Sequence, residues 1–501
     1  MNNSKKVIVI GLDGVNWQLI NKLIDGGFLP NIKKIKENGS FSSLRTTLPP
    51  VTAPAWTSFA TGANPGQHGC FEFVTPENDL DDYAPISSNS IKVKTFYEQL
   101  DEIGKKCILV NLPVSFPPKL SEIVITSLLT RGDDFVFPKK LIDEIPEFTK
   151  YKLAPEGKKE RKLKEHIHEI RDIEQTRFKC AQKLFKNKPW DFFFVLFSGT
   201  DWIQHTKYHD LINQDLKKNQ SVINIYQDID SYLGWFADNL PANTNLLVMS
   251  DHGFSDLKGV FFLNEWLAKE NYLQFKSKNK KHIDFGKISE SRDKSAKKAL
   301  NLNLSGLTSF MWKYPTIFKF AKKIYDKIKK ILPIYVDQDI GIDTLNSSVY
   351  SLSNLIYLNR KGRFSNGIID NDNEYKKIKQ EIIDKLTKIK GPDNKDRVFD
   401  VVADSQKIYS GRQVRNGPDI ILYSSKYLIK SIMGPAFVKG KFQYHSLDGI
   451  FISYGPDIKT NMELKQNNII DIAPTIFKLM NIEQSNIFDG HPISEAIIEK
   501  V

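Results

Sequence analysis

Three aspartates and three histidines occur in short polar motifs that border apolar runs of this 501-residue chain. Asp201 and His205 are four residues apart, so a helix that begins close to them would place both side chains on one face, a spacing suited to binding one ion. Asp251 and His252 are adjacent, and a tight turn after a strand can direct both toward one ion. Carboxylates and imidazoles suit Zn²⁺, with Mn²⁺ as a substitute. We therefore predict a site for two divalent ions, whose candidate ligands are Asp13, Asp201, His205, Asp251, His252 and His445.

A candidate nucleophile lies in the segment 48–62. We interpret Thr52 as the N-cap of a short helix, with Pro54 in its first turn and Gly62 at its end. A helix N-terminus exposes free N–H groups and positive dipole charge, which bind phosphate. A threonine hydroxyl held there against a metal can lose its proton and attack phosphorus. A capping threonine or a polar motif alone is most often only a cap or a turn, but Thr52 beside six candidate metal ligands predicts a catalytic group.

The elements that must position these residues follow from hydrophobic periodicity. Apolar runs of four to six residues suit strands buried on both faces of a parallel sheet, and segments with helical periodicity lie between them. We predict an α/β three-layer sandwich with a largely parallel central sheet, whose catalytic groups lie beyond the carboxyl ends of the strands. The expected strands are 7–10, 107–110, 192–197, 246–249, 420–423 and 450–453, and examples of the expected helices are 17–35, 160–185 and 375–389.

Composition narrows the class of protein. Hydrophobic residues make up 41% and charged residues 26%, which is ordinary for a globular chain and argues against disorder. No stretch reaches the ~18 apolar residues of a membrane span, and the run 7–10 is too short for a signal sequence, so we expect a cytoplasmic protein. Three cysteines without close spacing form neither a disulfide framework nor a cysteine-rich metal site. A metal would therefore need histidines and carboxylates.

Positive charge is concentrated in one segment. Residues 276–330 contain 16 Lys and Arg against 4 Asp and Glu, a net charge of +12 that equals the net charge of the whole chain. Within it, residues 318–332 mix lysines with isoleucines and phenylalanine in the pattern of a basic amphipathic helix. Two interpretations stay open: peripheral contact with an anionic membrane or another polyanion, or a solvated insertion. No nucleic-acid-binding motif accompanies the charge.

Several motifs together resemble the alkaline phosphatase superfamily. The resemblance is strongest to its type I phosphodiesterase/nucleotide pyrophosphatase branch, in the form of predicted archaeal and bacterial phosphohydrolases and phosphomutases. The matching motifs are Gly-Leu-Asp-Gly at 11–14, Thr-Ala-Pro-Ala-Trp at 52–56, Thr-Gly-Ala-Asn-Pro-Gly-Gln-His-Gly at 61–69, Gly-Thr-Asp-Trp-Ile-Gln-His at 199–205, Ser-Asp-His-Gly-Phe at 250–254, His445 with Gly455-Pro456, Asp-Ile-Ala-Pro-Thr at 471–475 and Asp-Gly-His-Pro at 489–492.

The resemblance implies an alkaline-phosphatase-like catalytic domain of residues 1–265 and 345–501, interrupted by a basic, partly helical insertion at 266–344. It also implies roles. Thr52 would be the nucleophile and form a phosphothreonine intermediate, in a two-metal scheme that splits hydrolysis into two transfers. One ion, expected to be zinc, would be held by Asp13, Thr52, Asp251 and His252, and the other by Asp201, His205 and His445.

Departures from the family pattern bear on the substrate. Nucleotide pyrophosphatases of this branch carry an asparagine that holds a phosphate oxygen where Phe73 stands here, so nucleotide specificity is in doubt. Thr52 cannot supply the formylglycine of a sulfatase, and Trp56 replaces the arginine of that motif. Between Arg45 and Arg131 there is no arginine to bind a dianionic phosphoryl group, which favours a monoanionic diester.

Alternatives remain within and beyond this chemistry. The loop 357–363 carries three cations, and through Arg360 it could reach a small-molecule phosphate ester. The runner-up activity is therefore a phosphomonoesterase, phosphonate hydrolase or phosphomutase on the same scaffold. An alternative of another class is a polyanion- or membrane-binding protein that has kept the site as a relic.

Overall fold

The computed structural model describes residues 5–79, 82–130, 132–156, 162–276, 341–432, 434–483 and 488–499. Its centre is a ten-stranded sheet with strand order β18-β2-β17-β9-β1-β8-β5-β6-β7, in which β19 also pairs with β2. The strands are β1 (Lys6–Leu12), β2 (Ser40–Arg45), β5 (Cys107–Leu112), β6 (Ile123–Thr126), β7 (Val136–Phe137), β8 (Phe192–Phe197), β9 (Thr244–Met249), β17 (Asp448–Tyr454), β18 (Met462–Glu463) and β19 (Asn467–Asn468).

The sheet is mostly parallel, as predicted. β9, β1, β8, β5 and β6 are consecutive parallel neighbours, and they contain four of the six predicted runs. Two predicted runs are placed differently. Residues 450–453 lie in β17, which is antiparallel to both β9 and β2, and residues 420–423 lie in another sheet. An apolar run reports burial on both faces, which does not depend on strand direction.

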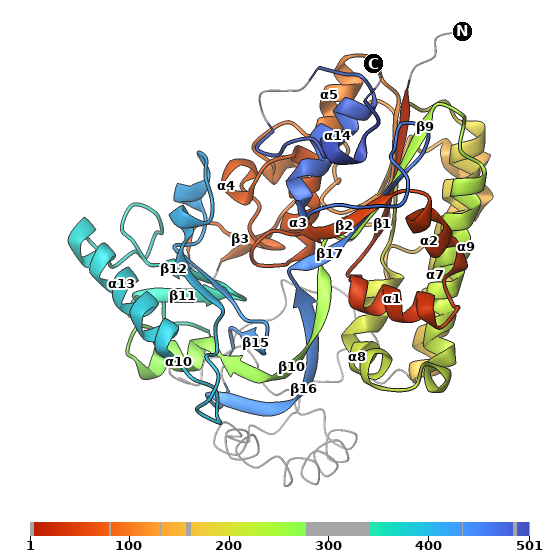
Figure 1. Cartoon of the computed structure of the whole chain (residues 1–501). Coiled ribbons are helices and arrows are strands. Elements are labelled where there is room, and N and C mark those ends of the chain that lie inside the picture. Colours follow the sequence, from red (N-terminus) through yellow and green to blue (C-terminus); the bar gives the residue numbers. More distant parts are fainter. Residues whose placement is uncertain are drawn as a thin grey trace, which may run out of the picture.

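Helices cover both faces of this sheet (Figure 1). Because side chains alternate along a strand, Ile8 and Ile10 of β1 pack on one helical layer, and Val7 and Val9 pack on the other. The first layer consists of α1 (Trp17–Asp25), α2 (Pro30–Glu37), α6 (Leu141–Glu144), α7 (Leu163–Asn187), α8 (Gly199–Asn213) and α9 (Gln220–Asp238). The second consists of α3 (Thr52–Thr61), α5 (Phe96–Glu102) and α14 (Ile472–Leu479). The α/β three-layer sandwich is confirmed.

The expected helix 17–35 is two helices, because Gly27 (φ 78°) and Pro30 interrupt it. The expected helices 160–185 and 375–389 correspond to α7 and α13. Shorter elements are α4 (Pro65–His68), the hairpin β3 (Val74–Pro76) and β4 (Tyr83–Pro85), and 3-10 turns at Ser88–Ser90, Pro146–Lys150, Leu216–Asn219, Ser405–Lys407, Val414–Asn416, Ile469–Asp471 and Ser494–Ala496. No described helix is long and apolar enough to span a membrane.

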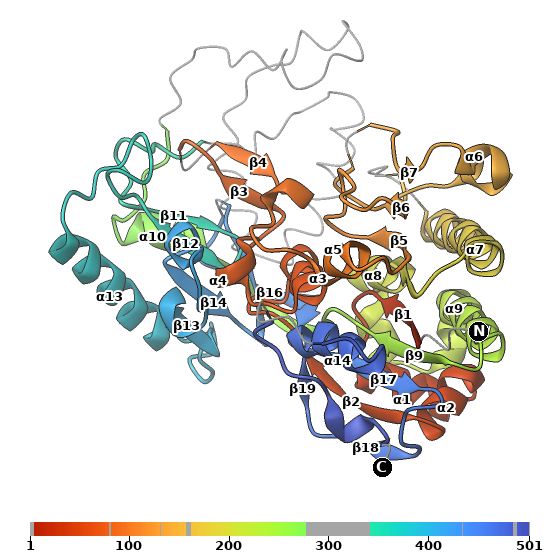
Figure 2. The same ribbon diagram turned by 90° about the horizontal axis from the view of Figure 1, so that it is seen from above.

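A small lobe lies beside the main sheet (Figure 2). Its antiparallel sheet has the order β11-β12-β14-β13 and shares one hydrophobic core with two helices. A three-stranded sheet, β15-β10-β16, runs from the site toward this lobe. The elements are β11 (Val349–Leu352), β12 (Leu355–Leu358), β13 (Val401–Asp404), β14 (Ile420–Tyr423), α10 (Leu263–Lys269), α13 (Asp372–Lys388), β10 (Gly253–Phe262), β15 (Tyr427–Lys430) and β16 (Phe437–Ser446).

The chain on the two sides of residues 277–340 is joined at one place, which lies inside the predicted insertion bounds 266–344. Lys276 N donates to Gly341 O at 2.8 Å, and Phe275 forms an antiparallel bridge with Ile342, so the two chain ends meet as a neck. On the near side of this neck, Leu267 and Leu273 pack in the core of the small lobe. Residues 277–340, with the predicted helix 318–332 and nearly all of the predicted polyanion contact 276–330, lie outside the described residues. The division into domains stays a prediction.

Candidate active site

The site lies at the carboxyl ends of three adjacent strands, β9, β1 and β8, where sequence analysis placed it. Asp13 directly follows β1, Asp251 and His252 follow β9, and α8 carries Asp201 and His205 after β8. The strands end in register, because Leu12 pairs with Phe197 and Gly11 with Met249. Side chains more than 180 residues apart in the sequence are thereby gathered at one edge of the sheet.

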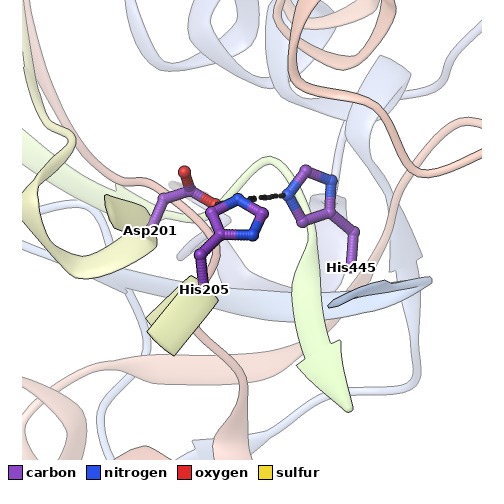
Figure 3. Close-up of side chains that lie close together, drawn as sticks. All are labelled: Asp201, His205 and His445. Atoms are coloured by element: carbon purple, nitrogen blue, oxygen red, sulfur yellow. Dashed lines mark hydrogen bonds and ion pairs between the residues drawn. The ribbon is translucent and has the colours of Figure 1, made fainter. Parts of the chain in front are cut away.

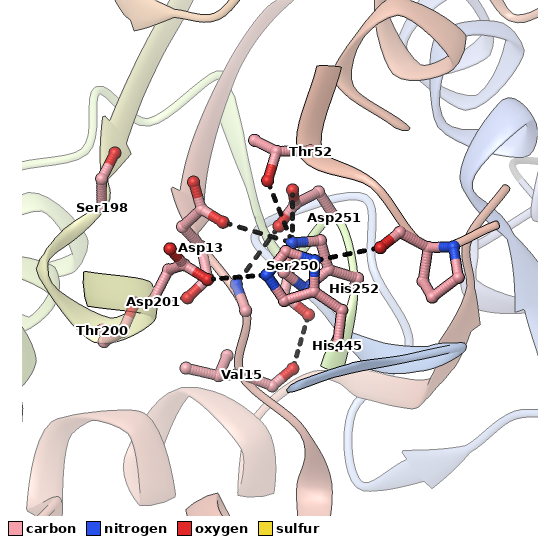
Figure 4. A network of polar contacts seen from close by, with 12 residues as sticks. Asp13, Val15, Thr52, Ser198, Thr200, Asp201, Ser250, Asp251, His252 and His445 are labelled. Atoms are coloured by element: carbon pink, nitrogen blue, oxygen red, sulfur yellow. Dashed lines mark hydrogen bonds and ion pairs between the residues drawn. The ribbon is translucent and has the colours of Figure 1, made fainter. Parts of the chain in front are cut away.

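The first ligand group is Asp13, Asp251 and His252. His252 Nε2 lies 3.4 Å from Asp251 Oδ2 and 3.7 Å from Asp13 Oδ1. Thr52 Oγ1 lies 3.1 Å from the same nitrogen (Figure 4). All four residues are buried. The predicted nucleophile therefore joins the three residues that the resemblance assigned to the same ion.

The second ligand group is Asp201, His205 and His445 (Figure 3). Asp201 Oδ1 lies 3.4 Å from His205 Nε2 and 3.3 Å from His445 Nε2, and the two nitrogens are 3.3 Å apart. Asp201 and His205 share a face of α8, as their spacing predicted. His445 comes from β16, a strand that sequence analysis did not predict.

The two groups form one site. The rings of His252 and His445 stack with centroids 3.7 Å apart and an interplanar angle of 23°. His252 Nδ1 lies 3.1 Å from the carbonyl oxygen of Gly253, and His445 Nδ1 lies 3.0 Å from that of Pro50. A carbonyl oxygen can only accept, so each Nδ1 donates its proton and each neutral ring presents a lone pair at Nε2. This backbone support orients both nitrogens toward the ligand groups.

The carboxylates need positive charge. Within the described ranges, Asp13 Oδ1, Asp201 Oδ1 and Asp251 Oδ2 are buried oxygens that accept no hydrogen bond. An ionised carboxylate is costly to bury unless it is paired or binds a metal. In each group, three ligand atoms lie within 4.8 Å of one another. Donor type, spacing and orphaned oxygens therefore fit two divalent cations.

The pKa values report the same imbalance. Burial, then the charges of Asp251 and Asp201, raises the pKa of Asp13 well above its usual range. Burial and the charge of Asp201 raise the pKa of Asp251 to about 8. Burial would also raise the pKa of Asp201, but the imidazoles of His205 and His445 outweigh it and hold that pKa below the usual range. The first group thus lacks the neutralising partners that the second possesses.

Thr52 is not an N-cap, which corrects the prediction. The N-cap of α3 is Val51, whose backbone is extended, and Thr52 is the first helical residue. A capping Thr52 would accept from the backbone two or three residues on, and one of these residues is Pro54, which has no N–H. Its hydroxyl is therefore free to face His252, and Gly62 ends the helix in a left-handed conformation, as predicted.

Phe73 and Arg360, the two residues predicted to contact the substrate, lie in different parts of the structure. Phe73 is half-buried in a small apolar cluster with Ala53, the neighbour of Thr52. Arg360 is in the small lobe, where its guanidinium pairs with Asp372 and lies 5.1 Å from the ring centroid of Tyr375. Substrate binding by Phe73 and Arg360 stays a prediction.

Sequence analysis missed Lys430, at the end of β15. Lys430 is an exposed residue, and desolvation of its ammonium group lowers its pKa. Burial and the charge of Lys430 lower the pKa of His205, but the charge of Asp201 outweighs them. The signal was absent because a lone lysine at a strand end resembles any solvated lysine.

Comparison with known proteins adds a family and a fold. The family model for type I phosphodiesterase / nucleotide pyrophosphatase matches residues 7–429. Murine ectonucleotide pyrophosphatase / phosphodiesterase 5 superposes with a TM-score of 0.53 at 14% identity, over 98% of this chain and 100% of that one. An inactive threonine-to-alanine variant of it, in complex with AMP, gives 0.52 at 14% identity over 96% of each chain.

Phosphonoacetate hydrolase from Sinorhizobium meliloti 1021, in complex with phosphonoacetate, gives a TM-score of 0.54 at 16% identity over 95% of this chain and 96% of that one. No curated protein matches the sequence. These structures share the α/β fold of the chain, at identities too low to carry more than the fold.

Proposed function

The chain belongs to the type I phosphodiesterase / nucleotide pyrophosphatase family, and from that premise we propose that it cleaves phosphodiester or nucleotide-type bonds through a covalent intermediate on Thr52. It is a phosphodiesterase-like hydrolase of phosphoric esters. The observation that carries the finer proposal is the 3.1 Å approach of Thr52 Oγ1 to His252 Nε2, at the edge of a buried, unneutralised ligand group.

Two divalent ions, with zinc preferred over manganese, are proposed as cofactors. Asp13, Thr52, Asp251 and His252 would hold one, and Asp201, His205 and His445 the other. When bound, such ions lower the pKa of a hydroxyl or water and neutralise charge that develops on phosphoryl oxygens. The orphaned oxygens of Asp13 and Asp251 support this assignment, since each accepts no hydrogen bond and would be satisfied by a cation.

The chain's own groups account for two transfers. Thr52 Oγ loses its proton to solvent and forms a bond to phosphorus while the ester P–O bond opposite breaks, and the leaving alkoxide takes a proton from solvent. Water then forms a P–O bond and breaks the bond to Thr52 Oγ, which regains its proton. Thr52 lies in the first turn of α3, so free backbone N–H groups of that turn would face a phosphate bound at Thr52. The inactive threonine-to-alanine variant of the murine relative supports a threonine nucleophile.

A second candidate is hydrolysis of a phosphonate or phosphomonoester that carries a further negative charge. Lys430 is the cation that this candidate would use, because its positive charge acts on His205 of the second ligand group. The similar fold of phosphonoacetate hydrolase also supports it. If this candidate holds, Lys430→Ala should raise KM for phosphonoacetate while KM for a neutral-tailed diester stays unchanged. Equal KM changes for both substrates would show that Lys430 does not bind the additional negative charge.

The experiment that tests the proposal combines elemental analysis with hydrolysis of bis(p-nitrophenyl) phosphate by the wild type, Thr52→Ala and Thr52→Ser. We expect two equivalents of metal in the wild type, no turnover in Thr52→Ala and residual turnover in Thr52→Ser, which keeps a hydroxyl. Acid-quenched wild type should carry substrate-derived mass on the peptide with Thr52. Metal-free wild type, or a fully active Thr52→Ala, would favour a relic site.

A further inference from the structure

A buried ion pair lies behind α8, outside both ligand groups. Glu174 and Arg177 are three residues apart on α7, and neither side chain is more than 1% exposed. Arg177 Nη1 donates to Glu174 Oε2 at 2.6 Å. Taking two charges out of water costs about as much as their attraction returns, so such a pair is weak evidence for stability. What the pair contacts is therefore the better guide to its role.

Glu174 binds the first residue of the helix that carries two candidate ligands. Its Oε1 accepts from Gly199 N at 2.6 Å, and Gly199 is where α8 begins. The first N–H groups of a helix have no partner inside the helix, and the helix dipole favours an anion there. A Cβ on Gly199 would lie 3.0 Å from Glu174 Cγ and 2.8 Å from Ile170 Cγ2. The glycine of the Gly-Thr-Asp motif thus allows this carboxylate to approach.

Arg177 touches the same turn and is itself held. Its guanidinium lies 5.6 Å from the ring centroid of Trp202, the residue after Asp201. It also donates to Tyr151 Oη at 3.2 Å and to the Leu153 carbonyl at 3.3 Å. The pair therefore contacts α8 just before and just after Asp201.

The opposite side of this turn is held by the first ligand group. Thr200 Oγ1 donates to the backbone carbonyl of Asp13 at 2.6 Å. Residues 199–202 are thereby fixed between α7 and the end of β1. A shift at Gly199 would pass through two residues to the Asp201 carboxylate and through one helical turn to His205.

We propose that Glu174 is a positioning residue for Asp201 and His205: its carboxylate fixes the start of α8 through Gly199, and Arg177 holds that carboxylate in place. This inference rests on the proposed function, because it requires Asp201 and His205 to bind an ion. Loss of such an outer hydrogen bond should weaken one of the two ions by about 10- to 100-fold and leave the other unchanged.

The test compares two double variants, Glu174→Gln/Arg177→Met and Glu174→Leu/Arg177→Met. Neither contains a buried unpaired charge, and they differ in whether a side-chain oxygen can accept from Gly199 N. Zinc affinity and stoichiometry are measured on the metal-free full-length proteins by chelator competition. We expect the glutamine variant to bind both ions almost as the wild type does. The leucine variant should bind one ion ~10- to 100-fold more weakly.

Two further variants keep the test decisive. Gly199→Ala disturbs the same contact from the side of α8 and should weaken the same ion, even if the leucine variant does not fold. Asp419→Asn breaks the ion pair of the buried Asp419 with the half-buried Arg363 in the small lobe, so it should lower the thermal midpoint and leave zinc affinity unchanged.

Equal zinc affinities in the leucine and glutamine variants, or an unchanged Gly199→Ala, would overturn the positioning role while the proposed function stands. A wild type that binds no zinc would instead overturn the proposed function and this inference with it.

Discussion

The two ligand groups differ in exposure and in charge. In the first group, the side chains of Asp13, Asp251 and His252 are at most 3% exposed, whereas His205 of the second group is 37% exposed. The first group contains two carboxylates and one imidazole, and the second contains one carboxylate and two imidazoles. Thr52 lies against the first. This division suits a reaction whose nucleophile is kept from water while the opposite side opens to solvent.

The two ligand groups also differ in how the charge of their buried carboxylates is offset. In the second group, the imidazoles outweigh burial and lower the pKa of Asp201. In the first group, burial and the charge of Asp201 raise the pKa of Asp13 and Asp251. The enclosed group therefore depends more on bound cations than the open group does. Water cannot take the place of a side chain that is removed there, so substitutions in this group should have larger effects on activity.

The largest effect is expected from Asp251→Asn in the enclosed group. The change removes an anion that water cannot replace, so turnover of a chromogenic phosphodiester should fall by about 10³-fold or more. Asp201→Ala and His445→Ala should also cost several orders of magnitude, with little loss of fold. Steady-state kinetics, metal content and near-UV circular dichroism check these outcomes. Activity close to wild type in any of the three would contradict the assignment.

A smaller effect, of about 100-fold, is expected from His205→Ala. Because this side chain is partly exposed, added imidazole should enter the vacated space and restore part of the activity. His252→Ala serves as the matched case, since its side chain is fully buried and imidazole should not reach it. Equal rescue of both variants, measured as kcat against imidazole concentration, would abolish the distinction between enclosed and open groups.

A buried histidine outside both ligand groups, His68, gives a further prediction, on how the free energy of unfolding depends on pH. His68 bonds Ser58 Oγ at 2.9 Å and accepts from Cys70 N at 3.1 Å, and burial lowers its pKa to about 3. The folded state then binds fewer protons than the unfolded state between about pH 6.5 and pH 3. The free energy of unfolding is therefore full above that range and falls by about 1.4 kcal/mol per pH unit as the pH drops through it.

Urea denaturation between pH 7 and pH 4 measures this slope as the difference between wild type and His68→Gln. The exposed His491 provides the control, and His491→Gln should leave the slope unchanged. A wild-type slope in His68→Gln would mean that other groups carry the pH dependence.

The smallest effect is expected in the metal-free protein. Asp13→Asn removes a carboxyl group whose ionisation is opposed by burial and by the charges of Asp251 and Asp201, so it should stabilise the metal-free chain by about 0.5–2 kcal/mol while it impairs metal binding. Calorimetry with and without zinc checks the two signs. Lower stability of Asp13→Asn in the absence of metal would show that the first group is not strained.

The hydrophobic pattern of the sequence predicted the strands that are buried on both faces, because burial is what such a pattern records. β1, β5, β8 and β9 were found as apolar runs because both of their faces are covered by helices. Direction leaves no trace in such a run, so antiparallel β17 and the small-lobe strand β14 were grouped with them. β16 was missed because most of its residues are exposed or half-buried.

One part of the candidate site follows from local geometry alone. Asp201 and His205 face one way because helix geometry alone aligns positions four apart. The division of the candidate ligands between two ions was implied by the family resemblance. Local sequence could not supply it, since His445 reaches Asp201 only through tertiary packing. The contact of Glu174 with Gly199 likewise depends on tertiary packing. Thr52 was assigned the wrong helix position because the effect of Pro54 on capping was overlooked.

The neck where Phe275 meets Ile342 has an evolutionary consequence. Since both ends of the intervening chain are fastened at one point, its length is almost free to vary: each doubling of a closed loop costs only about 0.6 kcal/mol. Descendants of a common ancestor can therefore lengthen, shorten or exchange whatever lies beyond the neck without disturbing strands β1, β8 and β9. New functions can evolve beyond the neck while the residues of the candidate site stay unchanged.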